Sequence, residues 1–405
     1  MNLVLSLGTI IFGILFLFLF SFATLILLTV TTKQKEYDDV SHSISVIIPA
    51  YNEANNIERC ITSFQDQTHD DYEIIIVDDG STDNTRSIIN DHDVTLLTQD
   101  HNGKVTALNT AYEQAEGDII VAADADTAVK NDFLESITRP FGDKAVGAVS
   151  GAVTPFSYPT ALNAFQTVEY YYNNIIRHAV SHTFSTDIWF FGCIAAYRRD
   201  ALDDINGFPK DSLTEDMDTN LELRRHGWNT LHEPSAQGQT EPPRTMTGLA
   251  KQRQRWWGGG YQLLSKHRDL LHNEPTFTFI FYHHWWWAAY AVTSVPLLAY
   301  QYSYWLPTGI ANTAWYTFRW FTLLGPIIVF YNAASWLSAY NVFGVSSGIL
   351  TAILIATALW YYEKSPDLSD AMALFLYFPY TILLNAFILL GLYKARLEPE
   401  QTYIE

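Results

Sequence analysis

Segments without charged residues make up much of this chain, and they constrain its fold more than any other feature. Residues 1–32 and 371–393 carry no formal charge, and residues 275–362 carry only one. An apolar stretch of about 20 residues is long enough to cross the hydrocarbon core of a bilayer as a helix. The sequence therefore predicts five membrane spans, which lie near residues 3–30, 279–303, 315–337, 344–362 and 371–393.

A strongly charged segment separates the first of these spans from the others. Residues 33–273 hold 36 of the 43 acidic and 20 of the 24 basic residues, which gives this segment a net charge of −16. A segment of this length can bury a hydrophobic core of its own. We therefore expect one water-soluble domain. The two cysteines, Cys60 and Cys193, provide no disulfide framework, which is typical of a reducing cytoplasm.

Basic residues next to the spans predict how the chain is oriented in a membrane. Lys33 and Lys35 follow the first span, and Lys394 and Arg396 follow the last. Because basic residues are enriched on the cytoplasmic side of a membrane, the soluble domain and the C-terminus are expected in the cytoplasm. The predicted location is therefore the cell membrane, with a multi-pass chain whose soluble domain is cytoplasmic.

The soluble segment alternates between short β-branched strands and helices. Strands are predicted at residues 43–50, 73–77, 94–97 and 118–123, and helices at 83–90 and 102–115. A further helix is expected to open near Tyr51, with Asn52 as its N-cap. This alternation predicts an α/β fold with a mostly parallel, doubly wound sheet. Ligands of such sheets bind beyond the C-terminal ends of the strands.

Pairs of acidic residues follow two of the predicted strands. Asp78 and Asp79 end the second strand, and Asp124 and Asp126 follow the fourth. Each pair alone is compatible with helix capping or an ordinary turn. Together, at one edge of a sheet, they indicate a site for a nucleotide and a divalent metal. Mg²⁺ or Mn²⁺ is expected because these ions prefer oxygen ligands and need only one or two carboxylates, and Asp126 is the expected ligand.

An acidic triplet and a basic, tryptophan-containing segment follow further along the chain. Thr214-Glu215-Asp216 opens a predicted helix at 214–226, and these acids are also compatible with a capping role alone. Residues 244–268 contain six Lys or Arg residues and no acid. Such a segment indicates an anionic ligand, a lipid headgroup surface or a solvated helix face. Because membrane-length segments begin directly afterwards, we expect interfacial helices at residues 244–273.

Six motifs, in their order along the chain, resemble those of the processive, membrane-embedded glycosyltransferases of family 2. The motifs are Pro49-Ala-Tyr-Asn-Glu53, Asp78-Asp-Gly-Ser-Thr-Asp83, Asn102-Gly-Lys104, Asp124-Ala-Asp126, Thr214-Glu-Asp216 and Gln252-x-x-Arg-Trp256. Within that family the chain is most similar to the poly-β-1,6-N-acetylglucosamine synthases, and it is also similar to hyaluronan, chitin and cellulose synthases.

The resemblance implies a division of the chain into membrane and cytoplasmic parts. The expected parts are an N-terminal transmembrane helix at 1–32, a GT-A glycosyltransferase domain at 33–243, interfacial helices with the Gln-x-x-Arg-Trp motif at 244–273, four transmembrane helices at 274–395 and a cytoplasmic tail at 396–405.

The resemblance also implies roles for the residues that would bind a sugar–nucleotide donor. Tyr51 and Asp79 match positions that hold the uracil ring, and Lys104 lies near the uridine diphosphate. Asp124 matches a nucleotide contact, and Asp126 matches the metal ligand. Glu53 belongs to the first motif and is expected to contact the substrate as well.

The remaining matched residues would carry out the transfer. Asp216 matches the general base, and Glu215 is the expected catalytic neighbour beside it. Gln252, Arg255 and Trp256 match the motif next to the diphosphate and the acceptor sugar. The chemistry agrees independently, because a guanidinium suits a diphosphate and a hydroxyl that attacks an anomeric carbon needs a base. An interfacial anchor remains the alternative role for the tryptophan.

Two further features leave the acceptor pocket less defined. Arg253 adds charge to the basic motif but fills a variable position in it. Phe190-Phe-Gly-Cys193 departs from the Ser-Gly or Cys-Gly of several relatives, and Cys193 is expected to be a small buried residue and not a nucleophile.

The resulting hypothesis is an inverting, metal-dependent synthase that polymerises N-acetylglucosamine from UDP-GlcNAc into a β-linked polysaccharide and extrudes it. The expected partners are the UDP-sugar, the growing polysaccharide, membrane lipid and a candidate small accessory membrane subunit, with no nucleic acid. Three alternatives remain open: a synthase of the hyaluronan, chitin or cellulose type, an enzyme that transfers a single sugar to a polyprenyl-phosphate lipid, and a non-catalytic membrane subunit or receptor. The intact acids of all three motifs argue against the last, because a binding module has no need of Asp216.

Overall fold

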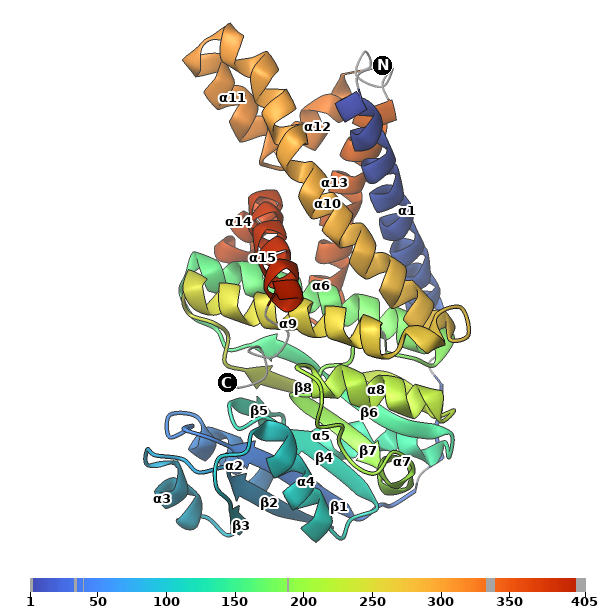
Figure 1. The fold of residues 1–405 in the computed structure, drawn as a ribbon, viewed down its shortest axis with the longest axis vertical. Coiled ribbons are helices and arrows are strands. Elements are labelled where there is room, and N and C mark those ends of the chain that lie inside the picture. Colours follow the sequence, from blue (N-terminus) through green and yellow to red (C-terminus); the bar gives the residue numbers. More distant parts are fainter. Residues whose placement is uncertain (1–2, 33–34, 39, 188, 333–338, 398–405) are drawn as a thin grey trace.

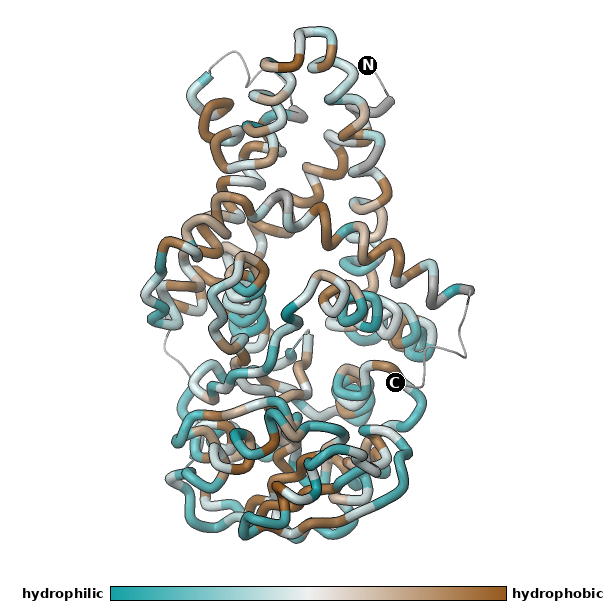
Figure 2. The backbone as a smooth tube through the Cα atoms, turned by 90° about the vertical axis from the view of Figure 1, so that its left-hand side faces the viewer, coloured by the Kyte–Doolittle hydropathy of each residue, from teal (hydrophilic) through white to brown (hydrophobic). Residues whose placement is uncertain are grey.

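The computed structural model describes residues 3–32, 35–38, 40–187, 189–332 and 339–397. An α/β domain lies at one end of the molecule and a group of long helices at the other, with two helices, α6 and α9, between them (Figure 1). Coloured by hydropathy, the helices at the upper end contain many apolar residues, and the lower end mixes apolar stretches with many hydrophilic ones (Figure 2). The uneven distribution of charge in the sequence is therefore reproduced in space.

An eight-stranded mixed sheet forms the centre of the α/β domain. Its strands are β1 (Ile44–Ala50), β2 (Tyr72–Asp78), β3 (Thr95–Thr98), β4 (Ile119–Ala123), β5 (Thr127–Val129), β6 (Val146–Pro155), β7 (Ile194–Arg198) and β8 (Asn229–Thr240). They are arranged in the order β3-β2-β1-β4-β7-β6-β8-β5. The four predicted strands are β1 to β4 and pair in parallel, as predicted, whereas β7 is antiparallel to both of its neighbours.

Helices cover both faces of this sheet. One face packs against α2 (Ile57–Gln65), α3 (Thr85–Asn90), α5 (Phe133–Thr138) and the 3₁₀ turn at Arg139–Gly142. The other packs against α4 (Lys104–Gln114) and α7 (Arg199–Asp204). Alternate residues of β1 enter the two cores: Ile48 belongs to the first and Ile47 to the second. A strand buried on both faces has no polar alternation, which explains its continuous apolar sequence.

The expected N-cap at Asn52 is wrong. Asn52 has a left-handed backbone (φ 54°), and α2 begins only at Ile57. The Asn52 side chain instead accepts a hydrogen bond from the backbone N–H of Thr82 (2.8 Å), and its own N–H donates to Ser81 Oγ (3.0 Å). An asparagine tolerates this conformation because its short side chain bonds locally. The residue therefore joins two loops at the edge of the sheet.

Helices α6 (Ala161–Phe184) and α9 (Met246–Lys266) lie between the sheet and the apolar helices, and α8 (Glu215–Arg225) lies below α9 beside the sheet (Figure 1). A shared hydrophobic cluster joins them to the helices above, through residues such as Ile176 of α6, Leu221 of α8 and Leu263 of α9. Phe22, near the end of the first long helix, belongs to the same cluster. The two ends of the molecule are therefore packed against each other through side chains.

Seven helices and two 3₁₀ turns make up the rest of the described chain. They are α1 (Leu3–Thr31), the turn Arg268–Leu270, α10 (Pro275–Trp305), the turn Leu306–Thr308, α11 (Ile310–Trp320), α12 (Leu324–Tyr331), α13 (Ala339–Tyr361), α14 (Leu368–Phe375) and α15 (Tyr377–Leu397). Two stretches, Ser6–Thr31 in α1 and Asn341–Tyr361 in α13, are long and apolar enough to cross a membrane. They agree with two of the predicted spans, and the chain has the character of a membrane protein.

The other predicted spans differ from single straight apolar helices. The pair Leu368–Phe375 and Tyr380–Tyr393 would form one span only with a bend of 65°. The span predicted near 279–303 lies in α10, which is 31 residues long. This helix contains histidines and many tyrosines, and it is less apolar than α1 and α13.

The span predicted at 315–337 is wrong as one continuous helix. It is broken between Trp320, the end of α11, and Leu324, the start of α12, and residues 333–337 lie outside the described part. Gly325 allows the chain to approach itself closely at this break. A Cβ at position 325 would lie only 2.3 Å from the carbonyl oxygen of Arg319. The predicted residues Lys33 and 398–405 also lie outside the described chain.

Candidate active site

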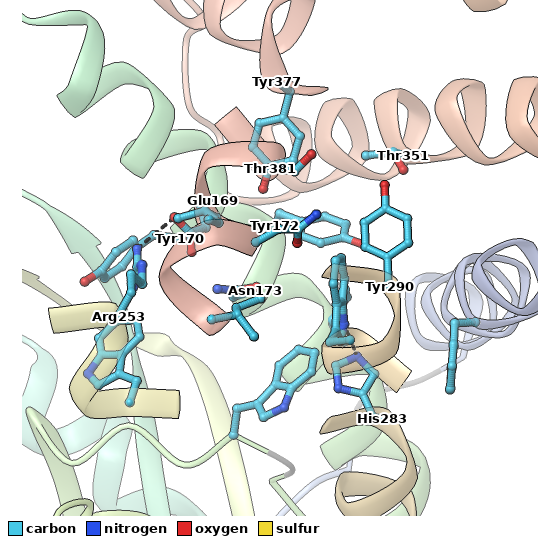
Figure 3. A pocket seen from close by; sticks show the side chains of 18 of the residues that line it. Glu169, Tyr170, Tyr172, Asn173, Arg253, His283, Tyr290, Thr351, Tyr377 and Thr381 are labelled. Carbon is cyan, nitrogen blue, oxygen red and sulfur yellow. Dashed lines mark hydrogen bonds and ion pairs between the residues drawn. The ribbon is translucent and has the colours of Figure 1, made fainter. Parts of the chain in front are cut away.

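One cavity of about 800 Å³ connects the edge of the sheet with the long helices. Lys104, Asp124, Asp126, Glu215 and Asp216 line its lower part. Side chains from α1, α10, α13 and α15 line its upper part, which we call the membrane end: they include Phe18, Trp286, Tyr290, Ser347, Thr351, Thr381 and Asn385. Figure 3 shows tyrosine, threonine, asparagine and histidine side chains gathered around this part.

The carboxylate of Asp79 holds the loop that precedes α4. It accepts hydrogen bonds from Gln99 Nε2 (2.6 Å), from the backbone N–H of Asn102 (2.9 Å) and from that of Gly103 (2.8 Å). Nδ1 of His101 lies 2.9 Å from its second oxygen. A carboxylate offers about four acceptor positions, so the loop occupies those of Asp79. Asp79 is buried and therefore positions the loop and, through it, the start of α4.

The aromatic ring of Tyr51 stacks on that same loop. Its centroid lies 3.9 Å from the imidazole centroid of His101, with 18° between the rings. Tyr51 is 43% exposed, and neither ring lines the main cavity. Tyr51 and Asp79, the two residues expected to hold the uracil ring, thus lie beside the cavity. His101, which the sequence did not single out, contacts both of them.

Lys104, the first residue of α4, connects two of the acidic motifs. Its Nζ lies 2.6 Å from Asp124 Oδ1 and 2.6 Å from Glu215 Oε1. Burial disfavours the charged ammonium, but the two carboxylates outweigh burial and raise the pKa of Lys104 well above its ordinary value. Burial likewise disfavours ionisation of Glu215, yet Lys104 lowers the pKa of that carboxyl. The predicted site residues from three distant segments are therefore brought together.

Asp126 lies next to this group and has the environment of a metal ligand. Its Oδ1 accepts hydrogen bonds from the hydroxyls of Thr127 and Thr240, both at 3.2 Å. Burial, and then the negative charges of Asp124 and Glu53, raise the pKa of Asp126 to about 7. An excess of carboxylate oxygen in one place fits a hard divalent cation. Asp126 and Asp124 are therefore the residues that could hold it.

A different cluster in the described chain has the spacing of a three-residue metal site. Asp218, Glu222 and His267 offer ligand atoms within 4.8 Å of one another. Asp218, however, already contacts Lys266 Nζ (2.8 Å) and His267 Nε2 (2.7 Å). Arg225 lies 2.9 Å from the other ring nitrogen of His267. Because cations already compensate these acids, we interpret the cluster as a link between α8 and α9.

Asp216 is the second residue of α8, and it lines the cavity. Its Oδ2 accepts a hydrogen bond from the backbone N–H of Gly192, and its Oδ1 accepts one from that of Met217, both at 2.8 Å. Burial, and then the charge of Glu215, raise the pKa of Asp216 to about 6. A Cβ on residue 192 would lie 2.5 Å from the Cβ of Asp216, so only glycine fits. Gly192 of the Phe-Gly-Cys segment is therefore required by the close approach of Asp216, which the sequence did not reveal.

The basic motif lies on α9, and its side chains line the same cavity. Gln252, Arg255 and Trp256 all contribute to the wall. The helix approaches the acidic triplet closely, because a Cβ on Gly259 would lie 2.6 Å from Cγ2 of Thr214. The predicted general base and the predicted acceptor platform therefore face one space. Glu53 lies outside the wall but contributes its charge to Asp126.

Arg253, expected at a variable position, forms a buried ion pair. Its Nη2 lies 2.8 Å from Glu169 Oε2 on α6, and its guanidinium carbon lies 4.2 Å from the ring centroid of Trp256. The hydroxyl of Tyr380 donates to the same oxygen of Glu169 (2.6 Å). Arg253 and Glu169 both line the cavity (Figure 3). Sequence reasoning missed this pair, because its two residues lie 84 positions apart.

Comparison with known proteins agrees with this geometry. Residues 45–205 match the family described as Glycosyl transferase family 2. The chain is 30% identical over 233 residues to the poly-beta-1,6-N-acetyl-D-glucosamine synthase of Staphylococcus aureus strain MSSA476. It is 31% identical over 228 residues to that of Staphylococcus epidermidis. The first match covers 56% of this chain and 56% of the relative, so the chain spans little more than half of that relative's length.

A solved structure supports the fold over the whole chain. A mannosyltransferase from Pyrobaculum calidifontis, described in complex with GDP-Man and Mn²⁺, matches with a TM-score of 0.62 at 21% identity. The match covers 98% of this chain and 99% of the other. The α/β domain therefore has the GT-A fold. Residues 45–205 of this chain therefore form a domain that matches glycosyltransferase family 2.

Proposed function

We propose that this glycosyltransferase polymerises N-acetylglucosamine from UDP-GlcNAc, with inversion at the anomeric carbon, and passes the β-linked chain across the membrane. The similarity to poly-β-1,6-N-acetylglucosamine synthases supports the choice of sugar. A single structural observation carries the proposal of polymerisation and extrusion. The cavity that contains Asp216 and Lys104 is also lined by residues of α10, α13 and α15.

The lower part of the cavity suits a nucleotide diphosphate. Lys104 and Arg255 supply positive charge beside it, and charged hydrogen bonds to phosphate oxygens are stronger than neutral ones. A divalent metal held by Asp126, with Asp124 beside it, would neutralise negative charge on the leaving diphosphate. Tyr51 would stack on the base from the edge of the site. In this arrangement the donor's phosphates lie over the ends of β2 and β4.

Asp216 is suited to remove the proton from the attacking hydroxyl. The backbone N–H groups of Gly192 and Met217 fix its carboxylate, and its raised pKa makes it a stronger base than an exposed aspartate. Trp256, which lines the same cavity, offers a flat face for the acceptor sugar. A base that lies on the face of the donor sugar opposite the diphosphate would direct the hydroxyl to attack from that face, and the new bond would form with inversion at the anomeric carbon.

The membrane end of the cavity suits a neutral polysaccharide. Its described lining combines aromatic rings with hydroxyl and amide groups, and Arg319 is its one charged side chain beyond α9. Such a lining can stack on sugar rings and bond their hydroxyls in turn. We propose a multi-pass arrangement in which the α/β domain faces the cytoplasm, where UDP-sugars are made, and the polymer leaves through the far side.

The test is to incubate purified protein in lipid nanodiscs with labelled nucleotide sugars and to size the products. The proposal predicts a ladder of long products from UDP-GlcNAc, sensitive to a hexosaminidase. A long polymer from UDP-glucose, or from mixed UDP-sugars, would instead support a cellulose or hyaluronan type of synthase. A single labelled sugar on a lipid would contradict polymerisation, and binding of nucleotide without any transfer would indicate a receptor.

A further inference from the structure

The ion pair between Glu169 and Arg253 leaves polar atoms unused inside the cavity wall. Both hydrogen bonds of Glu169 go to Oε2, from Arg253 Nη2 and from the hydroxyl of Tyr380, so Oε1 has no hydrogen bond within the described chain. Arg253 Nε and Nη1 are buried and likewise lack a partner there. Arg253 is 3% exposed and Glu169 is 9% exposed. Buried polar groups are almost always satisfied, so the two Arg253 nitrogens indicate a missing partner, and Glu169 Oε1 is an acceptor without a hydrogen bond in the same ion pair.

The position of the pair identifies where that partner would lie. The guanidinium of Arg253 lies over the ring of Trp256, and the ring of Phe191 stacks near the same tryptophan at 6.4 Å. All four side chains, Glu169 included, line the cavity that contains Asp216. A sugar that stacks on Trp256 would therefore have its substituents beside the unused acceptor of Glu169 and the unused donors of Arg253.

We propose that Glu169 and Arg253 form a subsite for the acetamido group of the acceptor sugar at Trp256. This inference rests on the proposed function and names the residues that select an N-acetylated acceptor. An acetamido group has one N–H donor and one carbonyl acceptor, which complement the free Oε1 of Glu169 and the free N–H groups of Arg253. The pair is neutral overall, so it does not require a charged substituent.

Other sugar substituents complement the pair less well. A carboxylate, as in a uronic acid, would meet the negative charge of Glu169 at close range. An ammonium, as in a deacetylated sugar, would meet the positive charge of Arg253. A hydroxyl presents both functions on one atom and lacks the methyl group, which can contact Phe191 or Trp256. Because a buried group left unpaired carries the larger energetic cost, discrimination against an analogue without the amide should be strong.

The experiment measures acceptor choice with UDP-GlcNAc as donor. Initial rates are compared for three oligosaccharides of equal length, made of N-acetylglucosamine, glucosamine or glucose. Wild type should favour the acetylated acceptor. Glu169→Gln and Arg253→Met should each reduce that preference at least tenfold, while the dissociation constant for UDP, measured by calorimetry, changes less than twofold.

A matched control separates selection from stability. Arg224 and Glu274 form another largely buried pair at 2.8 Å, on α8 and before α10, and neither lines the cavity. Arg224→Met should lower the melting temperature without changing acceptor preference. Tyr380→Phe keeps the ion pair and removes one hydrogen bond to Glu169, so it should fold and reduce the preference by a few fold.

Two results would overturn the inference. Equal loss of rate on all three acceptors in the Glu169 and Arg253 variants would assign the pair to holding α6 against α9. A wild type that extends all three acceptors equally would show that no acetamido subsite exists, while polymerisation itself would still stand. Failure of wild type to transfer N-acetylglucosamine at all would contradict the proposed function, and it is visible before any variant is made.

Discussion

Polar groups at the sheet edge are bonded by the chain itself, whereas several at the membrane end of the cavity have no partner in the described residues. At the sheet edge, Asp79 is surrounded by donors and Lys104 bridges two carboxylates. At the membrane end, Ser347 Oγ and both amide atoms of Asn385 are buried and unpartnered. Each such group costs about 1–3 kcal/mol when left unsatisfied.

The difference matches the two ligands of the proposed function. A nucleotide binds in one position, so the groups around it can be fixed in advance by hydrogen bonds within the protein. A polymer moves through its site, so the groups along its path must stay available to each new sugar unit. We therefore interpret the unpartnered groups of α13 and α15 as contacts for a moving chain, and those near Asp79 as parts of a rigid donor site.

The largest expected effect is loss of turnover when the metal is removed. Excess chelator should abolish transfer, and Mg²⁺ or Mn²⁺ should restore it, because the diphosphate leaves from beside the acidic group around Asp126. Asp126→Asn should be equally inactive. Its melting temperature should be unchanged, because the substitution removes a carboxyl group that is repelled by Asp124 and Glu53. Full turnover in excess chelator would contradict the proposal that transfer requires a divalent metal.

The next effect concerns the base. Asp216→Asn should lower the transfer rate by about 10²–10⁴-fold, as loss of a general base usually does. Affinity for UDP should stay near that of wild type, because the hydrogen bonds of Asp216 go to Gly192 and Met217 and not toward Lys104. Calorimetry with UDP distinguishes a general base from a residue of the donor site. A loss of UDP affinity as large as the loss of rate would assign Asp216 to the donor site.

The pH profile offers a smaller and independent check on the same residue. Asp216 must be ionised to accept a proton, and its pKa is raised to about 6. At saturating Mg²⁺, which keeps Asp126 ionised, the rate should therefore be level above that pH and fall about tenfold for each pH unit below it. The fall should disappear in the residual activity of Asp216→Asn. A profile unchanged down to pH 4.5 would contradict this assignment.

The smallest effect distinguishes the two regions by stability. Asn385→Leu removes an unpartnered buried amide from α15, so the melting temperature should stay the same or rise, while polymer yield falls a few fold. Asp79→Ala should do the opposite to stability, because it leaves the buried donors of the 99–103 loop without an acceptor. Equal destabilisation by both changes would show that Asn385 has a structural partner and would end the comparison.

The sequence was most informative where structure is local. The parallel strands β1 to β4 and the helices after them follow from periodicity, and the acids at their ends lie together because parallel strands share one edge. Glu215, Asp216 and the α9 motif join this edge as the resemblance implied. The strands and helices depend on a few neighbouring residues, whereas the approach of Glu215, Asp216 and the α9 motif to this edge is a distant contact that was expected from the resemblance alone.

Features that depend on distant contacts could not be predicted. The pair of Arg253 and Glu169 joins residues 84 positions apart, and no local pattern marks it. Gly192 is required only because Asp216, 24 positions away, approaches it. The break before Leu324 likewise depends on how Gly325 packs against Arg319, while the apolar composition on either side favours a single span.

The central claim, that the polymer passes from Asp216 into the membrane end of the cavity, is tested most directly by filling that space. Ser347→Trp places a bulky ring in the cavity from α13, and Ile353→Trp places the same ring on the exposed side of the same helix, where Ile353 is 54% exposed. Products from UDP-GlcNAc are sized, and UDP affinity is measured for both. The account predicts products of only a few sugars from Ser347→Trp, long polymer from Ile353→Trp and normal UDP affinity in each. Long polymer from Ser347→Trp would contradict it.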